Sequence, residues 1–128
     1  MSDKDFPEAL SSFIQDAIPT VDAAELLVTL ARQSDRSFDP AAAVEAMRPS
    51  PMTDQDARRY LAHFESRGIV VNTGSAGYRY APATADLDRT VNDLVRVFNE
   101  RPVTLVRLIY AGKDEKIRSL ADAFRIKK

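Results

Sequence analysis

The chain has 128 residues, 45% of them hydrophobic, with 18 basic and 19 acidic residues and no cysteine. Its length indicates one domain, and its hydrophobic content excludes an intrinsically disordered chain. The lack of cysteine excludes thiol catalysis, disulfides and cysteine metal sites. The apolar runs are too short for a membrane span and the acidic N-terminus does not fit a signal peptide, so we expect a cytoplasmic protein.

Charge is unevenly distributed along the chain. Residues 1–50 hold nine acidic and four basic residues, residues 51–85 hold three and four, and residues 86–128 hold seven and ten. The net charge of −1 does not favour nucleic-acid binding by the chain as a whole, because phosphate neutralisation needs clustered lysine and arginine. Any basic surface must therefore come from the later part of the sequence.

A first amphipathic helix is predicted before Pro19, with Pro7 in its first turn. Asp22 and Glu25 have the spacing of a capping box, which predicts the start of a second helix. The apolar residues at helical spacing in these two segments are Phe6, Leu10, Phe13, Ile14, Ala17 and Ile18, then Leu26, Leu27 and Leu30.

A third helix is predicted after the polar loop 34–37. Asp39 is suited to its N-cap and Pro40 to its first turn, while the prolines at 49 and 51 prevent its continuation. Its expected buried face consists of Ala43, Val44 and Met47.

The stretch from 53 to 81 changes its periodicity midway. Thr53 predicts the N-cap of a helix and Gly68 its end, and between them Ala57, Leu61 and Phe64 form one apolar stripe with Tyr60 at its margin. The β-branched run 69–71 and the segment 78–80 then flank a turn at 74–77, which predicts a β-hairpin.

The hairpin's register is predicted from its turn. If Thr73 pairs with Tyr78, one face carries Ile69, Val71, Tyr78 and Tyr80, and Asn72 and Arg79 point outward. A short third strand near residues 36–38 would complete the sheet.

The C-terminal part is predicted to be helical in three pieces. Leu87, Val91, Leu94 and Phe98 step by four, three and four residues, as in a coiled-coil seam, before Pro102 interrupts the helix. A second piece ends at Gly112, and a last one carries Ile117, Leu120, Ala121 and Phe124. We expect these faces to form a homodimer through the C-terminal helices; the alternative is that they pack on the chain's own core.

The segment Phe64-Glu65-Ser66-Arg67-Gly68-Ile69-Val70 reads as an apolar residue, polar ones, then Arg-Gly-apolar-apolar. This pattern resembles bacterial winged helix-turn-helix regulators of the MarR, ArsR and PadR kind, and the resemblance extends over residues 22–81. It implies a mainly α fold with a small β-hairpin, divided into an N-terminal helix (1–20), a winged helix-turn-helix domain (21–82) and a C-terminal helical extension (83–128).

The resemblance places the helix that begins after Thr53 in the major groove of double-stranded DNA and the hairpin against phosphate or the minor groove. Helical geometry puts Ala62 and Ser66 on its outer face. Asp54 and Asp56, in its first turn, would repel phosphate. The predicted DNA-binding residues are Gln55, Arg58, Arg59, His63, Asn72 and Arg79.

No residue set predicts catalysis, a metal site or a cofactor, because His63 is the only histidine and has no partner at triad or metal-ligand spacing. The sequence therefore leaves two functions: a small DNA-binding transcription regulator, or a winged helix that binds a protein partner. An ordinary solvated helix face would equally explain Arg58, Arg59 and Arg67.

Overall fold

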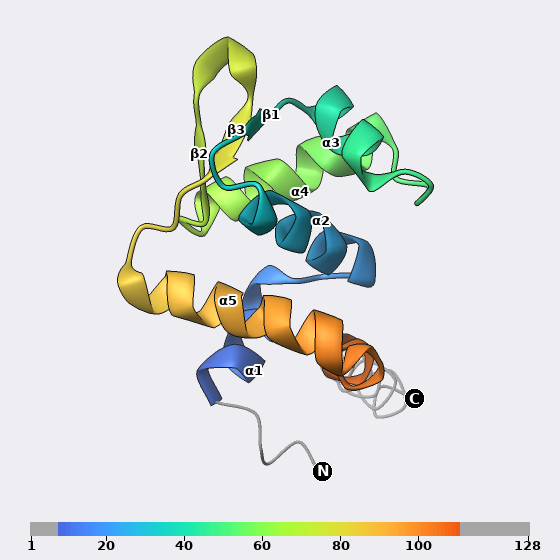
Figure 1. Ribbon diagram of the computed structural model, residues 1–128, viewed down its shortest axis with the longest axis vertical. Coiled ribbons are helices and arrows are strands. Elements are labelled where there is room, and N and C mark those ends of the chain that lie inside the picture. The colour runs from blue at the N-terminus through green and yellow to red at the C-terminus, as the bar shows by residue number, and fades with distance from the viewer. Residues whose placement is uncertain (1–7, 111–128) are drawn as a thin grey trace, which may run out of the picture.

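The computed structural model describes residues 8–110, which form a mainly helical fold with a small three-stranded antiparallel sheet (Figure 1). Its elements are α1 (Glu8–Ala17), α2 (Val21–Arg32), β1 (Ser37–Phe38), α3 (Pro40–Met47), α4 (Asp54–Ser66), β2 (Val70–Asn72), η2 (Gly74–Ala76), β3 (Tyr78–Tyr80) and α5 (Ala85–Glu100). The chain is helical again over residues 102–110. The predicted mainly α fold with a small hairpin is confirmed.

The start of α2 differs from the prediction. Thr20, in extended backbone geometry, is the N-cap, and its hydroxyl accepts the Ala23 N–H at 3.1 Å. The expected capping box of Asp22 and Glu25 is wrong, because Asp22 already lies inside the first helical turn and Glu25 instead accepts a hydrogen bond from the Ser50 hydroxyl. The Thr20 hydroxyl also lies 2.9 Å from the Tyr60 hydroxyl, which ties this cap to α4.

The predicted caps of α3 and α4 are both confirmed. Asp39 accepts from the Ala42 N–H at 2.7 Å, with Pro40 as the first helical residue. Thr53 accepts from the Asp56 N–H at 3.0 Å, and the Asp56 carboxylate accepts from the Thr53 N–H in return, which completes a capping box. The two capped helices pack against each other.

One hydrophobic core joins helices α1 to α5 and the helical segment 102–110. The predicted stripe of α4 is confirmed, since Ala57, Leu61 and Phe64 are 0% exposed, and Tyr60 is buried with them. In α3, Ala43 and Met47 are buried as predicted, whereas Val44 is only partly buried.

Helix α5 buries its apolar stripe inside the chain. It packs against α1 and α2 (Figure 1), and Val91 and Leu94 are fully buried. The alternative that this face packs on the chain's own core is therefore confirmed for these two residues, which a second copy cannot reach. The predicted stripe Ile117 to Phe124 lies outside the described residues.

The sheet has the strand order β1-β3-β2, and the predicted third strand is confirmed as Ser37–Phe38. The predicted hairpin register is wrong by one residue: Asn72 pairs with Tyr78, Val71 with Arg79 and Val70 with Tyr80. The turn is the cause, because the Thr73 N–H donates to the Gly77 carbonyl and closes a shorter loop over η2.

The register shift reverses which face of the sheet each β2 side chain points to. Val70 is now buried beside Tyr80, whereas Val71, which was predicted to face the core, is 39% exposed. Tyr78 remains on the inner face, opposite Phe38 of β1.

We predict that Phe64→Ala lowers the free energy of unfolding by about 3–5 kcal/mol, because it empties a fully enclosed site that the neighbouring helices cannot refill. Urea unfolding followed by circular dichroism measures the change. Val71→Ala, at an exposed position, is the control and should change the stability by less than about 0.5 kcal/mol. Equal effects of the two substitutions would contradict the assignment of the core.

Candidate nucleic-acid interface

Four of the predicted site residues lie on α4. The side chains of Gln55, Arg58 and Arg59 are exposed, and His63 is half-buried. Their outward position follows from the core, because burial of Ala57, Leu61 and Phe64 turns the other side of the helix to solvent. The helix thus exposes a polar face with two arginines.

Both arginines form ion pairs with aspartates of the same helix. The Arg58 Nε lies 2.9 Å from Asp54 Oδ2, and the Arg59 Nη2 lies 3.1 Å from Asp56 Oδ1. The Arg59 guanidinium also lies 5.3 Å from the centroid of the Tyr60 ring. The aspartates were predicted only to repel phosphate; their spacings of three and four residues from the arginines are the signal in the sequence that indicates these pairs.

A groove runs between α4 and the hairpin. Arg58 and Ala62 line it from α4, and Asn72 and Tyr78 line it from β2 and β3. Asp39, Pro40, Gly74 and Gly77 complete its wall. Tyr78 was not among the predicted site residues, because it was assigned to the core face of the hairpin; it does lie on that face, but it is only half-buried and lines the groove.

Asn72 and Arg79 lie on opposite faces of the sheet. Asn72 is paired with Tyr78 on the inner face at the groove, whereas Arg79 is paired with Val71 and Ser37 on the outer face. The prediction that both point outward together is wrong, since it depended on the register. The structure therefore brings Arg58 together with Asn72 and leaves Arg79 on another surface.

The hairpin tip is held by hydrogen bonds that also orient Asn72. The Asn72 side-chain oxygen accepts from the Gly74 N–H at 2.8 Å, so its amide nitrogen is the group left to donate into the groove. The Thr73 hydroxyl and backbone N–H both donate to the Gly77 carbonyl. Gly77 has φ +104, and a Cβ atom there would lie 2.2 Å from the Phe38 carbonyl oxygen.

A tyrosine hydroxyl connects the sheet to α5. Tyr80 donates to Asp88 Oδ1 at 2.7 Å, and burial together with the adjacent carboxylate raises the pKa of Tyr80 well above its usual value. The hydroxyl therefore remains a neutral donor. This bond fixes β3, and with it the inner side of the groove, relative to the helical layer.

No group of three or more histidine, aspartate or glutamate side chains within residues 8–110 is arranged to hold a metal ion. None of the helices in this range combines the length and apolar character that crossing a membrane requires. No protein-family model, curated protein or solved structure matches the chain.

We predict that Gly77→Ala destabilises the fold by more than about 3 kcal/mol, because the new methyl group meets backbone atoms of Phe38 and adds to the strain of a positive φ. Gly74→Ala is the matched control. It has φ +89 but open space around its Cβ position, so it should cost only about 1–2 kcal/mol. Thermal and urea unfolding of both variants measure the difference, and equal destabilisation would contradict the close approach at Phe38.

Proposed function

We propose that this protein is a small cytoplasmic transcription regulator that binds double-stranded DNA as a homodimer. In this proposal α3 and α4 form a helix-turn-helix, and the hairpin of β2 and β3 is its wing. The support is the order of elements from α2 to β3, three helices followed by a hairpin, which is the order that the family resemblance implies, together with the third strand β1 that completes the sheet.

The observation that carries the proposal is the groove between α4 and the hairpin. Arg58, Asn72 and Tyr78 come from three elements, and each offers a hydrogen-bond donor on the same groove. A DNA strand that passes between an inserted helix and a wing presents phosphate oxygens to such donors. Gln55 and Arg59, on the exposed face of α4, are the side chains suited to adenine and guanine edges in the major groove.

The ion pairs of α4 determine how strong this binding is expected to be. Exposed pairs of this kind contribute about 0.3–0.5 kcal/mol each, so phosphate can replace Asp54 or Asp56 as the arginine's partner at little cost. Until that exchange happens, the two aspartates cancel the charge of the two arginines. We therefore expect weak binding to random duplex.

The same ion pairs favour a second candidate function, docking of a protein partner. With Arg58 neutralised by Asp54 of its own helix, the groove presents a half-buried tyrosine and the Asp39 carboxylate of its wall rather than a basic surface. Such a surface is typical of peptide recognition as much as of DNA binding.

We predict that Arg58→Ala weakens binding to random duplex and flattens its log-log salt dependence by about 0.9 for each phosphate that the variant no longer neutralises. Fluorescence anisotropy at salt concentrations of about 50 and 200 mM, with a labelled duplex, measures both quantities. Arg89→Ala is the matched control, because Arg89 is also exposed and paired with an aspartate of its own helix, but on α5. If both variants bind like the parent protein, the groove does not contact DNA.

We further predict that replacing Asp54 and Asp56 together by Asn strengthens binding to random duplex, because it frees both arginines and removes two charges that repel phosphate. The same titrations measure this change. Asp86→Asn, which frees Arg89 on α5, is the control and should leave the affinity unchanged. No saturable binding by any of these folded proteins at the lower salt concentration would refute DNA binding and leave the docking function.

A further inference from the structure

The helical segment 102–110 carries an exposed apolar stripe, formed by Val103, Val106 and Tyr110. Their exposed fractions are 65%, 39% and 37%, and their spacing of three and four residues places them on one side of the segment. The other side packs into the core through Leu105, Leu108 and Ile109. Within residues 8–110, the only other large hydrophobic residue with comparable exposure is Val71.

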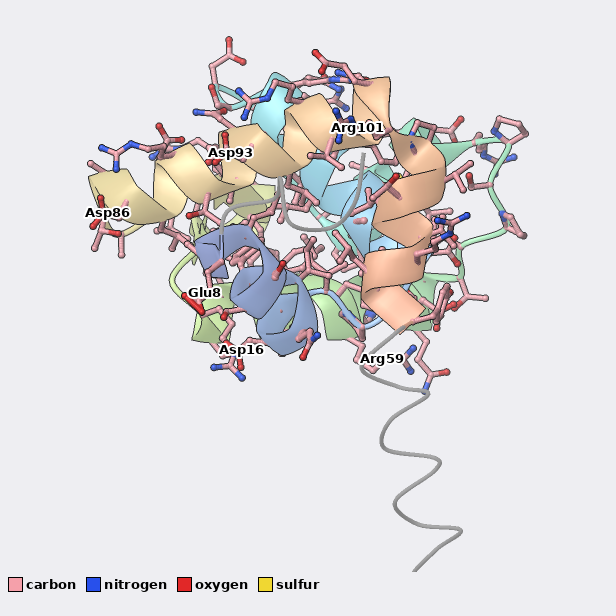
Figure 2. The ribbon with its side chains drawn as sticks, turned by 90° about the horizontal axis from the view of Figure 1, so that it is seen from below. Glu8, Asp16, Arg59, Asp86, Asp93 and Arg101 are labelled. Atoms are coloured by element: carbon pink, nitrogen blue, oxygen red, sulfur yellow. The ribbon has the colours of Figure 1, made fainter. Side chains whose placement is uncertain are left out.

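Two charged residues of opposite sign lie near this stripe. Glu100 is exposed at the end of α5, and Arg107 is exposed beside Val106. Neither takes part in an ion pair within the part of the chain that the structure describes, although six other arginines there do. The chain bends between these two charges, at the Arg101 labelled in Figure 2.

We propose that the stripe binds the same stripe of a second copy, around a two-fold axis that passes close to Val103. In such a symmetric contact, Arg107 of each copy meets Glu100 of the other. Val103 is the most exposed residue of the stripe and lines the same surface hollow as Glu100, so the axis is placed beside it. The inference rests on the homodimer of the proposed function and names the surface that forms it.

The buried seam of α5 supports this assignment. Val91 and Leu94 are fully covered by the chain's own helices, so a dimer through the C-terminal part needs another apolar face. The stripe supplies one, together with a pair of complementary charges. Since a single short helical segment covers a small area, the dimer is expected to be weak, with a dissociation constant on the order of 10 µM.

The first test is analytical ultracentrifugation of the full chain from about 1 to 300 µM, a range that brackets the expected dissociation constant. We predict a concentration-dependent monomer–dimer equilibrium that Val106→Glu weakens by at least about tenfold, because it places a charge in an apolar contact. Val71→Glu is the matched control, since Val71 and Val106 are both 39% exposed, and it should leave the equilibrium unchanged. Circular dichroism establishes that each variant is folded.

Charge reversal tests the pairing itself. Arg107→Glu should weaken the dimer because it places two carboxylates together at each end of the contact, whereas Arg107→Glu combined with Glu100→Arg restores opposite charges and should recover the association. A parent protein that stays monomeric at the highest concentration, or a double variant no better than Arg107→Glu alone, would overturn the proposal.

An engineered disulfide tests the position of the axis, because the chain has no cysteine of its own. Val103→Cys should form a covalent dimer rapidly under mild oxidation, since the two-fold axis brings both copies of this residue together. Val71→Cys should not, and equal cross-linking of the two variants would refute the axis at Val103. Binding of each monomeric variant to a short duplex, measured separately, distinguishes failure of the dimer from failure of the DNA-binding proposal.

Discussion

The burial of one side of α4 is the constraint on which the rest of the structure depends. Leu61 and Phe64 are completely enclosed, and Tyr60 beside them reaches the hydroxyl of Thr20 at the start of α2. Because a helix is rigid, fixing this side also fixes which residues face solvent, and Arg58 is directed to the groove by packing on the opposite surface. The candidate site is therefore a consequence of the core, and a change in the core would move it.

The sequence was sufficient for most features that neighbouring residues set, although it placed the cap of α2 at Asp22 instead of Thr20. The caps Asp39 and Thr53 were predicted correctly because a capping side chain bonds backbone groups only three residues away. The end of α4 followed from Gly68, whose φ of +75 is a conformation that other residues rarely adopt. These caps and the buried stripe of α4 needed no knowledge of the tertiary fold.

The main failures arose where a sequence pattern leaves more than one arrangement open. The hairpin register follows the turn that the Thr73 N–H and the Gly77 carbonyl close, and Gly77 also fits against the backbone of Phe38 on a strand that lies far away in the sequence. A one-residue difference there exchanged Val70 and Val71 between core and solvent and separated Asn72 from Arg79. The expectation that the α5 seam faces a second copy was wrong for Val91 and Leu94, because an apolar period indicates that a face is buried but not whether the partner is the same chain or another.

The charges of α4 are compatible with both of the proposed functions. An exposed ion pair contributes less than about 1 kcal/mol, so the pairs of Arg58 and Arg59 hold these side chains in place without committing them to their aspartates. In the proposed function, a phosphate would compete with a carboxylate already in place, which would lower affinity for every DNA sequence alike. A contact from Gln55 to a base edge would not face that competition, because Gln55 has no charge to neutralise, whereas Arg59 would first have to leave Asp56. Under that proposal the arrangement lowers general affinity relative to discrimination, and it favours a ligand that offers hydrogen-bonding shape over one that offers only negative charge.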